Sequence, residues 1–228
     1  MSIITFTPKT IPLSPISPNP EDFSVSPDVE QAVLAQTPIR STLFFRTIGS
    51  TNDYAKELLS GPASLAAMPA FPLLISAGEQ TAGRGRGVKK WWTGKGSVAV
   101  SLVLNLAEFH LDRNDLAPLS PLIAGVVGET IRSMIGGEHS LEIQPPNDVY
   151  LNGRKVAGIL VESPKPEYAI FGIGINTNNS VAHIPDELKA VPITTILDET
   201  GQTTDHAVFL VELFNRFFTK IRSWKRKW

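Results

Sequence analysis

The feature that most constrains the fold is a run of strand-like segments with no room for helices between them. "DVYL" (148–151) and "KVAGILVES" (155–163) are joined through a turn at Asn152-Gly153, and "YAIFGIGIN" (168–176) follows after four residues. Asn-Gly favours the two-residue type I′ turn, which joins antiparallel strands. A parallel doubly wound sheet would need a crossover, usually a helix, between consecutive strands. The sequence therefore predicts an α+β fold with a mixed, largely antiparallel sheet.

The remaining elements are predicted from apolar periodicity and capping residues. Val- and Leu-rich or alternating segments predict further strands at 41–45, 71–77, 97–106 and 141–144. Helices are expected after Ser26, with Pro27 in its first turn, and over 50–60, capped by Ser50. A long apolar helix within 115–135 is expected to begin near Pro118 or Pro121, and a last helix covers 205–224.

Composition limits the class of protein. The 228 residues suit one main domain, and the formal charge of -1 gives no global attraction to nucleic acid or membrane. The absence of cysteine excludes disulfides and thiolate metal sites, and the chain shows no signal peptide and no apolar run of membrane-spanning length. We therefore expect a cytoplasmic protein that does not bind membranes. The histidines have no metal-ligand spacing, so no metal site is expected and surface positions are predicted for His110, His139, His183 and His206.

The domain organisation follows from the distribution of proline. Residues 1–40 comprise a proline-rich arm and a short helix, and 41–228 form the main domain. The arm has no helical periodicity, so no DNA-binding helix-turn-helix is expected there.

The stretch "GEQTAGRGRGVKKWW" (78–92) concentrates glycine, basic residues and two tryptophans. A solvated basic loop, a single-strand nucleic-acid site and a phosphate-binding loop are all compatible with this composition. A conventional P-loop is disfavoured because Arg84 stands in the place of its lysine and Gly85 in the place of its serine or threonine.

A second group of residues suggests a small-molecule site. Lys155 follows the hairpin turn and is succeeded by Ala157 and Gly158, which would let a ligand approach the strand closely. "GIGIN" (172–176) has glycine at alternate positions and so clears one face of a strand, although close packing against a helix would explain the pattern equally well.

Taken together, these motifs resemble the biotin protein ligases. "STN" (50–52), "GEQTAGRGRG" (78–87), "KVAGILVE" (155–162) and "GIGIN" occur in that family's order, and the resemblance covers about residues 42–225. It implies a class II synthetase-like catalytic domain that joins biotin and ATP, with Mg²⁺, into biotinoyl-5′-AMP. The biotinoyl group would then pass to a lysine of the biotin carboxyl carrier protein of a carboxylase.

The resemblance also implies the roles of individual residues. The residues implied in catalysis are Arg84, Arg86 and Lys155. Those implied in biotin binding are Ser50, Thr51, Asn52, Gln80, Gly83, Arg84, Gly85, Arg86, Lys155, Gly158 and Gly174. Those implied in ATP binding are Arg86, Trp91, Trp92, Asn147, Lys155 and Asn176.

Two departures from the family pattern keep alternatives open. Gln144-Pro145 stands where the family usually has Lys-Trp, and the chain ends at Trp228, where the family normally continues into a small β-barrel, which we expect to be absent. The altered segment makes a non-catalytic biotin- or adenylate-binding protein an alternative. A lipoate or octanoate ligase is another, because it shares the fold and a similar lysine-bearing strand. Monomeric and homodimeric forms both remain open.

Overall fold

The computed structural model describes residues 26–61, 68–188 and 191–224. The proline-rich arm predicted before residue 26 lies outside the described residues. A seven-stranded sheet with the order β1-β2-β3-β7-β6-β5-β4 forms the centre. Its strands are β1 (Ser41–Ile48), β2 (Leu73–Gln80), β3 (Val98–Asn105), β4 (Leu141–Gln144), β5 (Asp148–Leu151), β6 (Arg154–Glu162) and β7 (Tyr168–Ile175).

The pairing confirms the predicted fold class. β1 and β2 are parallel, and every other neighbouring pair in the sheet is antiparallel. Between β5 and β6, Asn152 (φ 50°) and Gly153 (φ 75°) both have positive φ, as the type I′ turn requires.

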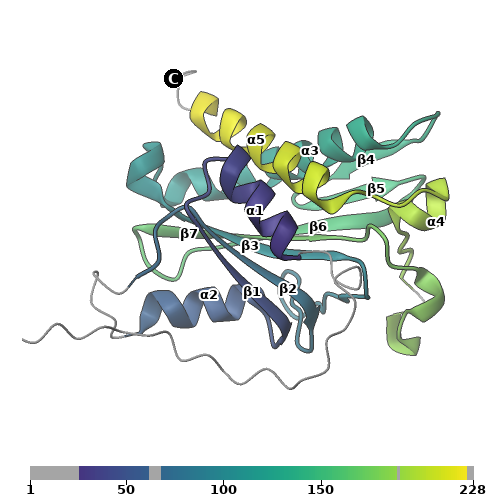
Figure 1. The fold of residues 1–228 in the computed structure, drawn as a ribbon, viewed down its shortest axis with the longest axis horizontal. Coiled ribbons are helices and arrows are strands. Elements are labelled where there is room, and N and C mark those ends of the chain that lie inside the picture. The colour runs from purple at the N-terminus through teal and green to yellow at the C-terminus, as the bar shows by residue number, and fades with distance from the viewer. Residues whose placement is uncertain (1–25, 62–67, 189–190, 225–228) are drawn as a thin grey trace, which may run out of the picture.

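The helices divide between the two faces of the sheet (Figure 1). The α-helices are α1 (Pro27–Gln36), α2 (Thr51–Ser60), α3 (Leu116–Met134), α4 (Ile196–Thr200) and α5 (His206–Trp224). Short 3₁₀ turns span Leu106–Phe109, Arg113–Asp115, Val181–His183 and Asp186–Leu188. In Figure 1, α2 lies below the sheet, while α1, α3 and α5 lie above it.

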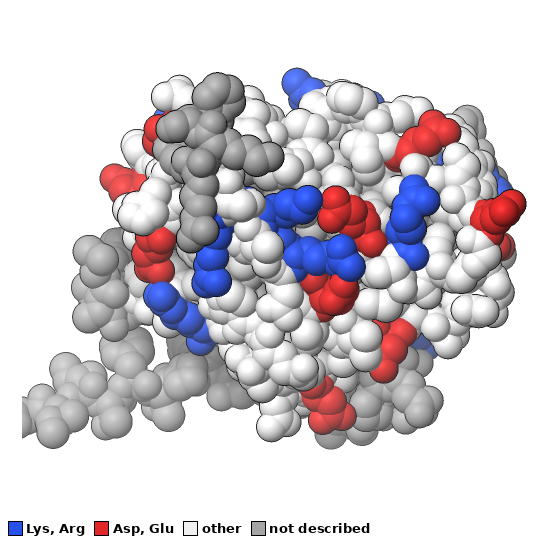
Figure 2. Space-filling model, turned by 90° about the horizontal axis from the view of Figure 1, so that it is seen from above, with Lys and Arg blue, Asp and Glu red and all other residues white. Residues whose placement is uncertain are grey.

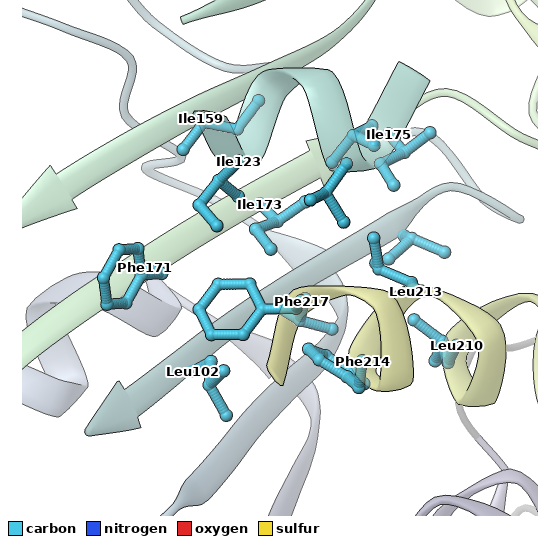
Figure 3. Packing of buried hydrophobic residues seen from close by; sticks show 14 of the residues in the cluster. Leu102, Ile123, Ile159, Phe171, Ile173, Ile175, Leu210, Leu213, Phe214 and Phe217 are labelled. Atoms are coloured by element: carbon cyan, nitrogen blue, oxygen red, sulfur yellow. The ribbon is translucent and has the colours of Figure 1, made fainter. Parts of the chain in front are cut away.

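Strand periodicity explains how the two faces differ. Along β7, Phe171 and Ile173 belong to the large core under α3 and α5, whereas Ile170 belongs to a smaller core under α2. Figure 3 shows Phe171 and Ile173 close to Phe217 of α5. Gly172 and Gly174 must therefore face the side of α2, and this side carries the cavity described below.

The long central helix starts earlier than predicted. α3 begins at Leu116, so Pro118 lies in its first turn and Pro121 lies inside it. The amide groups of a first turn have no partner within the helix, so Pro118 removes no hydrogen bond there. Pro121 removes one bond, but the buried face of α3 is long enough to keep the helix intact.

The N-terminal helix is part of the same folded unit. Ser26 accepts a hydrogen bond from the Val29 amide as N-cap, and Pro27 occupies the first turn, as predicted. Val29 and Val33 are buried in the large core. The division of the chain at residue 40 stays a prediction.

Charges are mixed on the side of the molecule that carries α5. Figure 2 shows basic and acidic side chains interspersed there. Glu129 of α3, for example, lies 3.4 Å from Lys220 and 3.7 Å from Arg216 of α5. Among the described residues, no helix combines the length and apolar character needed to cross a membrane.

Candidate active site

A cavity of about 690 Å³ opens beside the N-terminus of α2, over the face of the sheet that carries the β6 and β7 glycines. Every site residue predicted from the sequence lines it except Gly83. Four segments far apart in the chain therefore meet at one place. They are the start of α2, the loop after β2, the β5–β6 hairpin and the end of β7.

The polar floor of the cavity is built around the start of α2. Ser50 caps the helix by accepting a hydrogen bond from the Asp53 amide. Thr51 donates its backbone N–H to Gln80 Oε1 at 2.9 Å, and Asn52 contacts buried Ser101 of β3 through its Oδ1. Because Thr51 and Asn52 are almost completely buried, these bonds set which donors and acceptors a ligand would meet.

The basic stretch after β2 folds back on itself as a small hairpin. Trp91 donates its backbone N–H to the Gly83 carbonyl (2.9 Å), and Gly85 donates to the Lys89 carbonyl (2.7 Å). A Cβ at position 83 would lie 2.5 Å from the Trp91 carbonyl oxygen, so glycine is required there. Gly87 takes a positive φ of 66° at the tip.

The two arginines of this hairpin have different surroundings. Arg84 is held by Asp53 (2.7 Å from Nη2 to Oδ1) and by Glu162 (2.7 Å from Nη2 to Oε2). Burial opposes the charge on Arg84, but hydrogen bonds from its guanidinium to Glu162 and Asp53 outweigh this effect and raise its pKa. Arg86 is exposed at the rim, where the structure gives it no ion pair within the described residues. Arg84 thus anchors the base of the hairpin, and Arg86 stays available.

Trp91 fills the notch left by two glycines that face each other across β6 and β7. Gly158 pairs with Gly174 in the sheet. A Cβ at Gly174 would lie 2.3 Å from Trp91 Cε2, and one at Gly158 would lie 3.3 Å from Trp91 Cζ3. The glycines predicted to make room for a ligand therefore make room for an indole ring in this structure.

Lys155 is fixed at one end of this indole. Its ammonium lies 2.7 Å from Asp148 Oδ1 and 5.7 Å from the centre of the Trp91 ring. Its backbone donates to the Pro192 carbonyl (2.7 Å) and accepts from the Thr194 amide (2.9 Å). Both ends of the side chain are therefore constrained, and the ammonium points along the cavity wall.

Asn147 and Asn176, which were predicted to lie on the nucleotide side, both line the cavity. Asn147 donates from Nδ2 to the Ile159 carbonyl (2.8 Å), and Asn176 donates to the Thr194 carbonyl (3.1 Å). Gln144 and Pro145 line the cavity as well and are exposed. The departure from the family pattern thus falls within the cavity rather than on a remote surface.

Sequence reasoning missed several residues that hold the site together. Glu162 lies on the same face of β6 as Gly158 and Leu160, so strand parity could have identified it. Asp148 lies opposite Gly158 because of a register shift between Val149 and Tyr150, which counting from the hairpin turn does not reveal. Ser101 gave no signal, because a serine within an apolar strand is not distinctive.

The prediction that all the histidines lie on the surface was wrong for His206. Its Nε2 lies 2.8 Å from Thr177 Oγ1 at the end of β7, and burial lowers its pKa to about 4, against a small opposing effect of Asp205. The residue was misassigned because the sequence did not show that α5 begins against the β7 end. Among the described residues, no group of three or more His, Cys, Asp or Glu side chains could hold a metal ion.

Comparison with known proteins agrees with this geometry. The model of the biotin/lipoate A/B protein ligase family matches residues 45–178, which is more than half of the chain. The bifunctional ligase/repressor BirA of Bacillus subtilis is 32% identical over 187 residues, covering 80% of this chain and 54% of that protein. The biotin–[acetyl-CoA-carboxylase] ligase of Paracoccus denitrificans is 36% identical over 169 residues, covering 71% of this chain and 65% of that protein.

A solved structure shows the same relationship. The biotin protein ligase from Aquifex aeolicus in complex with biotin and ATP has a TM-score of 0.66 at 29% identity, covering 83% of this chain and 73% of that one. This chain spans about half the length of the ligase/repressor relatives it matches. With the family match and the shared fold, the chain belongs to the biotin/lipoate A/B protein ligase family.

Proposed function

We propose that this protein activates biotin with ATP as biotinoyl-5′-AMP and transfers the biotinoyl group to a lysine of a biotin carboxyl carrier protein. One observation carries the proposal. A single cavity combines a buried polar floor (Thr51, Asn52), a fixed ammonium (Lys155) and a cationic hairpin (83–91). The relatives named as biotin ligases and the ligase bound to biotin and ATP support this choice of substrates.

The chemistry of the first step requires cations that are in place beforehand. A carboxylate attacks the α-phosphate, so two anions meet and negative charge accumulates on the phosphoryl oxygens. Preorganised cations that stabilise such charge lower the barrier, and they act more strongly where water is excluded. We assign this role to Lys155, which is held from both ends, and to Arg86, which is free to turn toward the cavity.

Arg84 has a different proposed role. Its guanidinium already serves two carboxylates, so turning it to a ligand would leave Asp53 and Glu162 to share the single ammonium of Lys56. We therefore propose that Arg84 keeps the base of the hairpin in place, while its neighbour Gly85 lets the backbone approach the ligand.

Magnesium would enter together with the nucleotide. Mg²⁺ binds through one or two carboxylates and the phosphates of a substrate. Asp148 lines the cavity and is a carboxylate that fits this description, whereas the described residues offer no all-protein cage. The ion would neutralise phosphate charge, and Lys155 would still hold the oxygens at the reacting centre.

We propose a carrier protein as the acceptor of the biotinoyl group, consistent with the relative named as an acetyl-CoA-carboxylase ligase. We propose no DNA partner. A cytoplasmic location is proposed on the cysteine-free composition, which suits a reducing compartment.

The decisive experiment incubates the protein with biotin, MgATP and an isolated carrier domain, with lipoate and octanoate run in parallel. We expect biotinylated carrier and biotin-dependent pyrophosphate release. Pyrophosphate release without carrier labelling would limit the activity to adenylation, and labelling by lipoate or octanoate would reassign the substrate. Biotin binding with neither product would leave a non-catalytic binding protein.

A further inference from the structure

A cluster of four charged side chains lies against the polar floor of the cavity. It joins Glu162 of β6, Asp53 and Lys56 of α2, and Arg84 of the hairpin. Arg84 lines the cavity, but Glu162 does not, and the proposed reaction gives Glu162 no role.

Glu162 is the shared member of this cluster. Its Oε1 lies 2.6 Å from Lys56 Nζ, and its Oε2 accepts from Arg84 Nη2 (2.7 Å) and from Asn52 Nδ2 (2.9 Å). Burial opposes ionisation, but hydrogen bonds from Lys56, Arg84 and Asn52 outweigh it and lower the pKa of the carboxyl. The carboxylate is thus charged at neutral pH and fixed in orientation.

This carboxylate decides which way the Asn52 amide points. Asn52 Nδ2 directs its hydrogens to Glu162 Oε2 and to the Leu160 carbonyl, so Oδ1 faces Ser101 Oγ at 2.5 Å. The reverse orientation would set the amide oxygen against a carboxylate and a carbonyl, and both of these are acceptors only.

The orientation spreads to the neighbouring hydroxyls. Because an amide oxygen has no hydrogen, the one Ser101 hydroxyl hydrogen is donated to Asn52 Oδ1. Ser101 Oγ is then left to accept from Thr51 Oγ1, 2.7 Å away, whose hydrogen also lies within reach of Gln80 Oε1 at 3.1 Å. Ser101 is therefore fixed as a donor to Asn52, and the one Thr51 hydroxyl hydrogen is directed to Ser101 or to Gln80. The remaining lone pairs of Asn52 Oδ1 and Thr51 Oγ1 can only accept hydrogen bonds.

We propose that Glu162 is a positioning and specificity-determining residue. By holding the Asn52 amide, it makes the cavity floor an acceptor surface, which selects ligands whose buried end carries N–H donors. A cyclic urea such as that of biotin has two such groups, whereas a dithiolane ring or an alkyl chain has none. This inference rests on the proposed function.

The test starts from Glu162→Gln, which keeps the size of the side chain but removes the charge. The single amide oxygen must now serve Lys56 on one side and Arg84 with Asn52 on the other, so in either orientation the NH₂ faces a donor and the hold on Asn52 weakens. A hydrogen bond to a charged group contributes roughly 1.5–3 kcal/mol, so we expect the Kd for biotin alone, measured by calorimetry, to rise about 10-fold or more. The rate of pyrophosphate release at saturating biotin should fall by a smaller factor than the affinity, because Lys155 and Arg86 are unchanged and Asp53 still holds Arg84.

A rescue variant separates positioning from general stability. In Glu162→Gln/Lys56→Met the ammonium is gone, so the glutamine oxygen can turn to Asn52 and Arg84, and biotin affinity should recover most of the loss. Glu108→Gln is the matched control, because it breaks only the exposed Arg40–Glu108 pair (2.9 Å) and should leave the Kd unchanged.

The outcomes distinguish the two proposals. If wild-type protein binds no biotin, the proposed function fails. If it binds biotin and Glu162→Gln binds equally well, or the double variant binds as weakly as the single one, the role of Glu162 is refuted. Thermal unfolding is recorded for each variant. Should Glu162→Gln alone be unfolded, the biotin affinity of the double variant is compared with that of Lys56→Met. A double variant that binds biotin about 10-fold or more weakly than Lys56→Met would refute the rescue.

Discussion

Replacing Gly174 by alanine should force Trp91 out of its notch. The added Cβ would lie 2.3 Å from Cε2, 2.6 Å from Nε1 and 2.7 Å from Cζ2 of the indole, well inside any van der Waals contact. Gly174 belongs to a central strand paired on both sides, whereas Trp91 follows an exposed hairpin. The indole is therefore the part that moves.

Gly158→Ala, on the neighbouring strand β6, is the matched control for the stability of Gly174→Ala. In Gly158→Ala the Cβ meets Trp91 Cζ3 at 3.3 Å, and the other close atoms belong to the flexible end of Lys155. Both substitutions remove the entropy cost of a strand glycine, about 0.5–1 kcal/mol, so this gain cancels in the comparison. Overpacking costs about 1–3 kcal/mol, so Gly174→Ala should be less stable than Gly158→Ala by about that amount.

Urea unfolding gives the stability difference, and tryptophan emission gives the position of the indole. We expect a red-shifted spectrum for Gly174→Ala and a spectrum close to wild type for Gly158→Ala. The shift should vanish when Trp91→Leu is added to Gly174→Ala, which assigns it to this tryptophan. Equal unfolding free energies for the two alanine variants, together with unshifted emission, would refute the packing argument.

Three further predictions follow from the same geometry. Lys155→Met should lower the rate of pyrophosphate release about 100-fold or more, whereas a near-normal rate in a folded protein would remove Lys155 from the chemistry. Gly83→Ala should disrupt the hairpin, because its Cβ would lie 2.5 Å from the Trp91 carbonyl oxygen, and faster proteolysis between Gly83 and Trp91 would report this. Because burial lowers the pKa of His206 to about 4 from 6.5, its contribution to stability is complete above pH 6.5 and is lost as the pH falls toward 4. The free energy of unfolding should fall by up to about 3 kcal/mol between these two pH values. In His206→Gln this fall should be absent when the free energy of unfolding is measured with urea across the same range.

The fold was predictable because its strongest signals are local. Asn152-Gly153 defines a hairpin by backbone conformation alone, and the apolar face of α5 repeats at helical spacing. The start of α3 was predicted too late because proline was taken as a boundary. The burial of Leu119 and Ile123 along one face decides where this helix runs, and that burial depends on the sheet beneath it.

The residues that line the cavity were easier to predict than the residues that hold them in place. Loop and glycine motifs placed Lys155 and the 83–91 hairpin at one cavity, but no pattern paired Arg84 with Glu162, which lies 78 positions further along. The same limit applies to Asn52 and Ser101, 49 positions apart. Such pairs depend on how α2 lies across the sheet, which a linear pattern does not contain.

The Gly-Arg-Gly-Arg-Gly stretch illustrates why those partners matter for the chemistry. In the sequence its two arginines look equivalent, yet one is neutralised by two carboxylates and the other is exposed at the cavity rim. A permanently paired Arg84 adds little attraction for an incoming anion, because its field is largely cancelled by Asp53 and Glu162. It can, however, hold the hairpin base rigid while Arg86 and the glycines at its tip move. The different roles of the two arginines thus follow from the carboxylates on α2 and β6. Removing those carboxylates should leave both guanidinium groups without an ion pair to these elements.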